Sequence, residues 1–196
     1  MSEPLIARID HVSIAVRDYE KAEKFFRTIL GGLPGAAAED PVTKYFWQIF
    51  SLGDLSRLEL VKPTAAGSFL DNFLAQREGG VHHVTMQTPD IEAAKTHLQR
   101  HGIPYFGYNE YATGWKEIFI HPRHAFGVLI QIAEFRPADY LAASVNLPED
   151  RRWTVEKNGD GVSLRLAHPG GGQVQVELSK SEVAKLIADL ETGKES

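Results

Sequence analysis

The hydrophobic and polar positions of the first 135 residues follow one pattern twice. Residues 9–16 alternate apolar and polar side chains with the two-residue period of a half-buried strand. Residues 81–88 repeat this alternation at an offset of 72 positions, and residues 57–61 fall on 129–133 at the same offset. Several matched segments in one register indicate an internal duplication.

Each copy predicts a strand, a helix and further strands. In the first copy Asp18 is the expected N-cap, because its oxygen can accept from free backbone N–H groups. Helical spacing of apolar residues predicts one buried stripe, and Gly31-Gly32 ends the helix. The stripe consists of Ala22, Phe25, Phe26 and Ile29.

The remaining elements complete a βαβββ unit that occurs twice. Strands are expected near 45–52 and 56–61 in the first copy and near 81–88, 116–121 and 127–133 in the second. A short helix over about 69–76, with Ser68 as its cap, links the copies, and a helix from Ile91 to about Arg100 closes at Gly102. The predicted fold class is α+β.

The tail has a different pattern. Segments 152–156, 161–167 and 173–178 predict a three-stranded meander with turns at 158–161 and 169–172. Ser179 with Glu182 forms a capping box for a helix over about 180–190. We therefore expect a domain over 1–135, with repeats at 8–62 and 80–134, and a C-terminal extension over 136–196. The extension is expected to pack on the repeats or on a partner subunit.

Composition and charge narrow the possible partners. The 196 residues carry a formal net charge of -5 and no basic stripe, so nucleic acid is not an expected partner. No apolar run is long enough for a membrane span or a signal peptide, so no membrane association is expected. The chain has no cysteine, which excludes disulfides and thiolate ligands and fits a cytoplasmic location.

Four polar positions are predicted to converge. Strand parity places His11 and His83 on the inner face of a curved sheet. His11 and His83 are equivalent positions of the two copies, and so are Glu59 and Gln131. If the copies pair about a pseudo-twofold axis, all four side chains can meet. Taken singly, each residue is more often an ordinary core or surface polar group; the shared register favours a common site.

These side chains suit a divalent metal ion. Imidazole nitrogen with carboxylate and amide oxygen fits Zn, Co, Ni, Mn or Fe. Four protein ligands around an octahedral ion leave two positions for the oxygens of a small-molecule substrate. No role is assigned to the other histidines, which are His82, His97, His101, His121, His124 and His168.

The repeated segments resemble the vicinal oxygen chelate superfamily, which includes glyoxalase I, extradiol dioxygenases and bleomycin-resistance proteins. The resemblance covers about residues 8–135 and is strongest to the methylmalonyl-CoA epimerase branch. It is carried by I-D-H-V at 9–12, E-L-V-K-P at 59–63, S-F-L-D-N-F-L at 68–74, G-V-H-H at 80–83, F-I-H-P-R at 119–123 and G-V-L-I-Q at 127–131. The resemblance implies a half-open barrel, one bound metal and a homodimer.

The chain departs from the epimerase pattern at three positions. The resemblance implies a carboxylate where Gln131 stands, and a glutamate on the strand where Gln48 stands. Many epimerases have glutamine where this chain has Glu59, so the ligand carboxylate has moved to the other repeat. An amide cannot remove a proton from carbon at neutral pH. Glu59 and Gln48 are therefore the candidate catalytic positions, with Tyr45, Glu117 or bound water completing a relay.

Three functions are compatible with these residues. The first is an isomerase or lyase that forms an enolate, epimerase-like on an acyl thioester such as methylmalonyl-CoA, with Lys44, Arg57 and Lys62 as candidate CoA contacts. The second is an Fe(II) extradiol-type dioxygenase using His11, His83 and Glu59, although such relatives take their carboxylate from the Gln131 position. The third is a non-catalytic binding protein of the bleomycin-resistance type, whose members generally lack the metal ligands.

Overall fold

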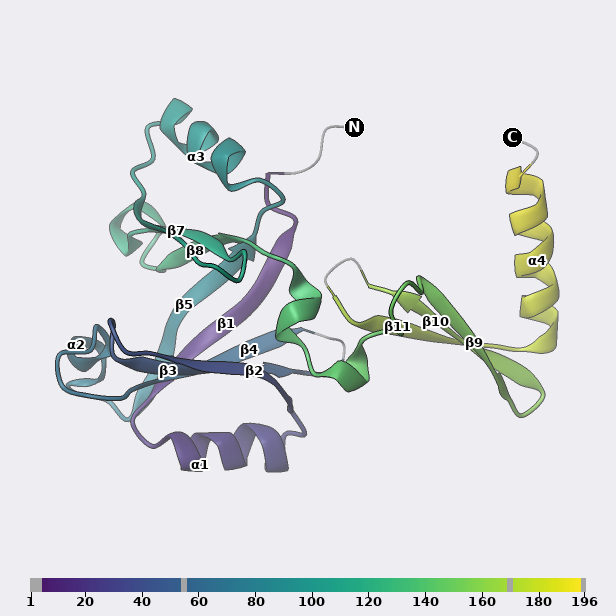
Figure 1. Cartoon of the computed structure of the whole chain (residues 1–196), viewed down its shortest axis with the longest axis horizontal. Coiled ribbons are helices and arrows are strands. Elements are labelled where there is room, and N and C mark those ends of the chain that lie inside the picture. The colour runs from purple at the N-terminus through teal and green to yellow at the C-terminus, as the bar shows by residue number, and fades with distance from the viewer. Residues whose placement is uncertain (1–4, 54–55, 169–170, 195–196) are drawn as a thin grey trace. The chain divides into compact units, whose positions relative to one another are not determined.

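The computed structural model describes residues 5–53, 56–168 and 171–194 and divides the chain into two compact units (Figure 1). The first unit comprises Met1–Ala142 and the second Ala143–Ser196. Within the described ranges, no helix combines the length and the apolar character that crossing a membrane requires.

One eight-stranded sheet forms the framework of the first unit. The strand order is β2-β3-β4-β1-β5-β8-β7-β6, so each repeat supplies four neighbouring strands and the predicted pair of βαβββ units is confirmed. The sheet curls into a half-open barrel (Figure 1). The strands are β1 (Arg8–Val16), β2 (Leu33–Asp40), β3 (Tyr45–Ser51), β4 (Arg57–Pro63), β5 (Gly79–Gln87), β6 (Phe106–Glu110), β7 (Lys116–Ile120) and β8 (Ile130–Glu134).

The pairing of the central strands follows the pseudo-twofold symmetry of the two repeats. The antiparallel strands β1 and β5 meet at the centre, with His11 opposite Thr85 and Ser13 opposite His83. Thr85 is the repeat equivalent of Ser13, so exchanging the two copies reproduces the same pairs. Glu59 pairs with Ser13 in parallel β1 and β4, as Gln131 does with Thr85 in β5 and β8. The four predicted ligands therefore lie on neighbouring central strands.

Helices cover the outer face of each half (Figure 1). Apolar side chains of α3 (Ile91–Arg100) pack against β7 and β8, where Ile118 and Ile132 are fully or almost fully buried. The helix of the first repeat packs through Ala22 and Phe26 on a cluster that contains the buried Phe50. The short helix α2 (Leu70–Leu74) buries both of its terminal leucines. These contacts fix the strands that carry the polar inner face.

The first helix differs from the predicted one. It consists of α1 (Tyr19–Glu23) and a π-helical segment, η1 (Lys24–Ile29), and Leu30 N donates to Phe25 O at 3.0 Å. A five-residue hydrogen bond widens the turn and rotates the following side chains away from the α-helical stripe. Phe25 and Ile29 are consequently 46% and 65% exposed, so the prediction that they are buried was wrong. Asp18 does cap the helix, accepting from Lys21 N at 3.0 Å.

Two strands had no predicted position within their repeats. β2 and β6 form the two edges of the sheet, and every residue of β6 is exposed. An edge strand without a buried face lacks the regular alternation that locates a strand in a sequence. The chain also forms the turn η2 (Pro122–His124) between β7 and β8, and the turn η3 (Pro137–Tyr140) after the second repeat.

The second unit matches the element order predicted for the tail. Its antiparallel sheet has the order β11-β10-β9, formed by β9 (Trp153–Asn158), β10 (Gly161–Ala167) and β11 (Gln173–Leu178). A short turn, η4 (Ala143–Val145), precedes the sheet, and α4 (Lys180–Lys194) follows it. Ser179 N donates to Glu182 Oε2 at 2.8 Å, which confirms the capping box. The predicted turn at 169–172 lies partly outside the described residues.

Candidate metal centre

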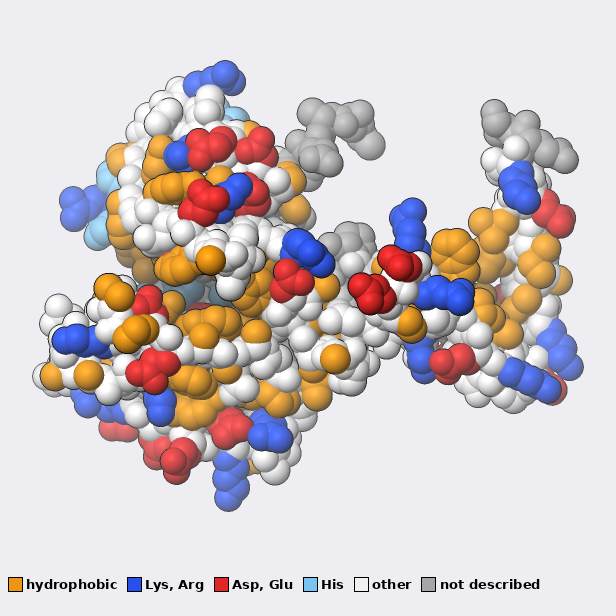
Figure 2. All heavy atoms as spheres, viewed as in Figure 1, with side chains coloured by type: hydrophobic (Ala, Val, Ile, Leu, Met, Phe, Trp, Pro, Cys, Tyr) orange, Lys and Arg blue, Asp and Glu red, His pale blue; other side chains and the backbone are white. Residues whose placement is uncertain are grey.

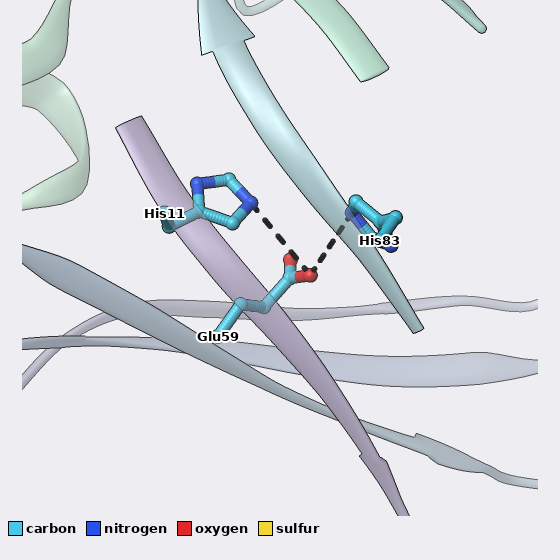
Figure 3. Close-up of side chains that lie close together, drawn as sticks. All are labelled: His11, Glu59 and His83. Atoms are coloured by element: carbon cyan, nitrogen blue, oxygen red, sulfur yellow. Dashed lines mark ion pairs between the residues drawn. The ribbon is translucent and has the colours of Figure 1, made fainter. Parts of the chain in front are cut away.

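Three of the four predicted metal ligands meet on the inner face of the sheet (Figure 3). One ligand atom each from His11, Glu59 and His83 lie within 4.8 Å of one another. Glu59 Oε2 is 3.8 Å from His11 Nε2 and 3.7 Å from His83 Nε2. The three residues are 2%, 9% and 7% exposed, so the cluster is shielded from bulk water.

Both imidazoles direct Nε2 toward the cluster because a neighbour occupies Nδ1. The carboxylate of Asp10 lies 2.8 Å from His11 Nδ1 and can only accept a hydrogen bond, so His11 Nδ1 is the donor. His82 Nδ1 lies 2.9 Å from His83 Nδ1, so one of these two nitrogens donates to the other. When His83 is the donor, both Nε2 lone pairs face Glu59. Metal-ligating histidines are commonly oriented in this way through their second nitrogen.

Asp10 is itself held by two arginines. Arg8 and Arg57 both bond to Asp10 Oδ1, and the Arg57 side chain is almost entirely buried. The register of β1 against β5 shifts between Ile9 and His11, which allows Asp10 and His11 to be buried together. Arg57 therefore supports the cluster from within the fold, and the expectation that it contacts a CoA phosphate was wrong.

Gln131 joins the cluster through Thr85. The Thr85 hydroxyl lies 2.5 Å from Gln131 Oε1 and 2.8 Å from His11 Nε2. The Thr85 hydroxyl has one proton, so once His11 Nδ1 donates to Asp10 it can donate to only one of these two atoms at a time. A bound cation would offer both lone pairs a further partner.

Glu117, on β7, fixes the other end of the Gln131 amide. Gln131 Nε2 donates to Glu117 Oε2 at 2.7 Å, which directs the amide oxygen toward the cluster. Three further donors reach the same buried carboxylate. They are Trp115 Nε1 at 2.8 Å, Asn109 Nδ2 at 3.1 Å and the Tyr111 hydroxyl at 3.3 Å.

Gln48 does not lie at this site. It pairs with Leu60 across β3 and β4, whereas Glu59 pairs with Ile49, and adjacent residues of a strand face opposite sides. The Gln48 amide oxygen accepts a hydrogen bond from Tyr19 on the helix-covered face. The structure therefore contradicts the placement expected for Gln48, and Ile49 is the neighbouring residue whose side chain faces the cluster.

Burial sets the protonation of the cluster. It raises the pKa of Glu59, which the negative charges of Glu117 and Asp10 raise further while His11 opposes the shift. It also lowers the pKa of His83 well below 6.5, so this imidazole is neutral at neutral pH. Burial and the carboxylates of Glu59 and Glu117 raise the pKa of Tyr45, which keeps its phenol protonated.

The donor set fits a divalent ion. Ligand atoms bound at about 2.0–2.2 Å from one ion lie roughly 3–4 Å apart, close to the observed separations. Neutral imidazoles offer lone pairs, and a cation would offset the cost of burying the Glu59 carboxylate. The residues present therefore suit Zn or a related transition metal.

Several residues around the cluster lay outside the sequence prediction. Asp10 and His82 adjoin the predicted ligands in the sequence, and Thr85 is the repeat equivalent of Ser13. The sequence shows that these residues adjoin or match positions near the ligands, but it does not show the direction of their side chains, on which their hydrogen bonds depend. Glu117 was expected only as a possible member of a proton relay, and its hydrogen bond to Gln131 was not predicted because it depends on side-chain direction.

Comparison with known sequences gives consistent relatives. The sequence profile of the glyoxalase/bleomycin resistance protein/dioxygenase superfamily matches residues 10–119. The ethylmalonyl-CoA/methylmalonyl-CoA epimerase of Cereibacter sphaeroides is 33% identical over 137 residues, which cover 66% of this chain and 99% of that protein. Human mitochondrial methylmalonyl-CoA epimerase is 32% identical over 132 residues, covering 66% and 74%.

Solved structures share the fold. Methylmalonyl-CoA epimerase from Mycobacterium tuberculosis aligns with a TM-score of 0.64 at 24% identity, covering 70% of this chain and 93% of that one. A variant of Streptomyces coelicolor methylmalonyl-CoA epimerase, in complex with 2-nitronate-propionyl-CoA, aligns with a TM-score of 0.59 at 24% identity, covering 66% and 98%.

Proposed function

Because this chain belongs to the glyoxalase/bleomycin resistance protein/dioxygenase superfamily, we propose that it is a metal-dependent epimerase of an acyl thioester such as methylmalonyl-CoA. The single observation that carries this proposal is the buried meeting of His11, Glu59 and His83 from both repeats. Relatives at about 30% identity are named as methylmalonyl-CoA epimerases, which supports the reaction class.

Four residues would hold the ion, namely His11, Glu59, His83 and Gln131. A divalent ion bound there would act as a Lewis acid that increases the acidity of a C–H bond next to a carbonyl. Asp10 and His82 would keep the two imidazoles oriented, and Glu117 would keep the Gln131 amide oxygen facing the cluster.

Glu59 is the group proposed to move the proton. Burial raises the pKa of Glu59, which favours proton uptake by this carboxylate, and a bound cation would oppose that shift. Epimerisation also needs a proton returned to the opposite face of the carbon. Glu117 lines the same cavity from the other repeat and is the second carboxylate in position to take part, in place of Gln48.

Solvent exchange tests this proposal. The metal-loaded protein should incorporate deuterium from D2O at C2 of methylmalonyl-CoA or of a 2-substituted analogue. Excess chelator should abolish the exchange, and Glu59→Gln should reduce it by at least about 100-fold, the lower range for loss of a general base. Exchange that persists in excess chelator would rule the metal-dependent mechanism out, and a thioester that binds tightly but is recovered unlabelled would support a binding protein.

One observation favours a second candidate, an Fe(II) dioxygenase. The cluster consists of two histidines and one carboxylate, which is the ligand set of many non-haem Fe(II) oxygenases. Oxygen consumption with catechols by the Fe(II)-loaded protein would support this function. No consumption under those conditions would end it.

Further properties belong to the same proposal. We expect a homodimer in a cytoplasmic location, with Zn, Co, Ni, Mn or Fe as the ion. The vicinal oxygen chelate domain is proposed to span residues 1–135, with 136–196 as an extension. Light scattering of the purified chain tests the homodimer. Elemental analysis of protein prepared without added metal tests the identity of the ion.

A further inference from the structure

The metal cluster opens into a cavity of about 410 Å³. His11, Glu59 and Gln131 form one side of this cavity, so a molecule bound at the cluster extends into it. Figure 2 shows hydrophobic side chains around the hollow between the two repeats. The aromatic residues that line the cavity are Tyr45, Trp47, Tyr111, Trp115 and Tyr140.

The aromatic rings hold one another in place. Tyr140, in η3, lies 5.2 Å from Trp115 of the second repeat and 6.2 Å from Trp47 of the first, measured between ring centroids. Trp115 stacks on Phe135 at 4.3 Å, and its indole N–H donates to Glu117. The rings are therefore packed before any ligand enters. A preformed aromatic cavity binds flat apolar groups without first having to order its walls.

The described residues that line the cavity include five carboxylates and neither lysine nor arginine. The carboxylates are Asp10, Glu39, Asp40, Glu59 and Glu117. An anionic group placed among the rings would lose its hydration without gaining a cationic partner. The part of the substrate that occupies the rings is therefore not anionic.

The nearby cations are occupied elsewhere. Arg57 is paired with Asp10 inside the fold. Lys62 lies over the rings of Tyr19 and Phe46, and Lys44 Nζ donates to a backbone carbonyl at 2.9 Å. None of these three lines the cavity, so the phosphates of a CoA thioester would lie outside it.

We propose that the cavity receives a flat aromatic substituent without negative charge, carried by the reacting carbon. This inference rests on the proposed function and names its substrate class, an aryl- or arylalkyl-substituted acyl thioester. A methyl substituent would leave most of the cavity volume to water between aromatic walls, whereas an aromatic ring would replace that water with ring contacts. Apolar cavities discriminate by about 10- to 200-fold even for one methylene group.

Two matched thioesters test the inference. Methylmalonyl-CoA and benzylmalonyl-CoA share the thioester, the carboxylate and the CoA portion, and they differ only in the C2 substituent. With the metal-loaded full chain in D2O, exchange at C2 should have a kcat/KM at least 10-fold higher for benzylmalonyl-CoA. Equal or faster exchange of methylmalonyl-CoA would overturn the substrate class while leaving the proposed function intact.

Neighbouring residues of β3 supply the variant and its control. Trp47 lines the cavity, whereas Phe46 faces the other side of the sheet and packs on Tyr19 at 5.1 Å. Trp47→Ala should bring the ratio of the two kcat/KM values toward one, and Phe46→Ala should leave the ratio unchanged. A ratio that Trp47→Ala leaves at its original value would contradict the assignment of the rings as the binding wall.

Binding separates the two possible failures. If neither thioester exchanges its C2 proton for deuterium, the proposed function fails. The inference about the cavity is then tested by the dissociation constants of the two thioesters, measured by tryptophan fluorescence. Benzylmalonyl-CoA binding at least 10-fold more tightly than methylmalonyl-CoA would support the aromatic cavity. Equal dissociation constants would overturn it.

Discussion

At the residue scale, the cluster depends on neighbours that orient each ligand. His11 and His83 have Nδ1 engaged by Asp10 and His82, and Gln131 has its amide nitrogen engaged by Glu117. Loss of such a neighbour changes the direction of a ligand atom without removing the ligand. The orienting residues are therefore more informative to substitute than the ligands themselves.

Asp10→Asn should weaken metal binding. An amide can present its N–H to His11 Nδ1 and so reverse the tautomer that directs the Nε2 lone pair inward. Substitution of a residue that hydrogen-bonds a metal ligand typically reduces metal affinity by 10- to 100-fold. Calorimetric titration of Zn²⁺ into chelator-treated protein measures the change. Asp139→Asn, at a half-exposed carboxylate 3.6 Å from Arg136, is the matched control. Unchanged Zn²⁺ affinity in Asp10→Asn would remove Asp10 from the site.

The Gln131 and Glu117 pair predicts a double-mutant cycle. Gln131→Glu places a second carboxylate beside Glu117, where the amide now donates at 2.7 Å, and should lower the free energy of unfolding by about 1–3 kcal/mol. Adding Glu117→Gln restores one donor and one acceptor and should recover most of that loss. Urea unfolding of the four proteins measures the coupling, and additive effects would contradict the contact.

His82 predicts a pH dependence of stability. Burial between Phe69 and Phe73 lowers the pKa of His82 from 6.5 to about 4. Between those values the unfolded chain binds a proton that folded His82 does not, so stability falls as the pH decreases from 6.5 to 4. In chelator-treated protein, His82→Phe should reduce the loss of unfolding free energy between pH 6.5 and pH 4 by up to about 3 kcal/mol. Identical pH profiles of the two proteins would contradict a neutral buried His82.

At the element scale, the pairing of β1 with β5 brings the two repeats together. Gly79 begins β5, and a side-chain carbon there would lie 2.8 Å from the Ala15 carbonyl oxygen of β1. Gly79→Ala should therefore separate the strands and lower the free energy of unfolding by about 1–3 kcal/mol. It should also weaken metal binding, because the two strands carry His11 and His83. Gly193→Ala in α4 enters open space and should change neither quantity appreciably. Wild-type stability of Gly79→Ala by thermal unfolding would show that this contact is easily relieved.

The elements that bury a face were predictable from the sequence, and the others were not. Alternation located β1 and β5, and the offset of 72 residues predicted which positions of the two copies are equivalent. The π-helical turn at Phe25 and the edge strand β6 have no hydrophobic period of their own. The expectation for Gln48 came from the family resemblance, and it failed because the register of β3 against β4 places Gln48 on the face opposite Glu59.

At the scale of the whole molecule, duplication explains how a short chain builds an enclosed site. Each repeat contributes one histidine and one oxygen ligand, and neither repeat alone contains the set. All the residues argued to hold or orient the ion belong to the unit formed by residues 1–142. The aromatic cavity lies in the same unit and includes Tyr140 from the segment that follows the repeats.

Anomalous X-ray scattering from crystals of the full chain, purified without added chelator, tests the central claim most directly. We predict one anomalous peak per chain, within about 2.0–2.2 Å of His11 Nε2, His83 Nε2 and a Glu59 oxygen. Gln131 Oε1 should face the same ion. A cluster that stays free of metal in crystals soaked with Zn²⁺, or imidazoles that point into separate regions, would contradict it.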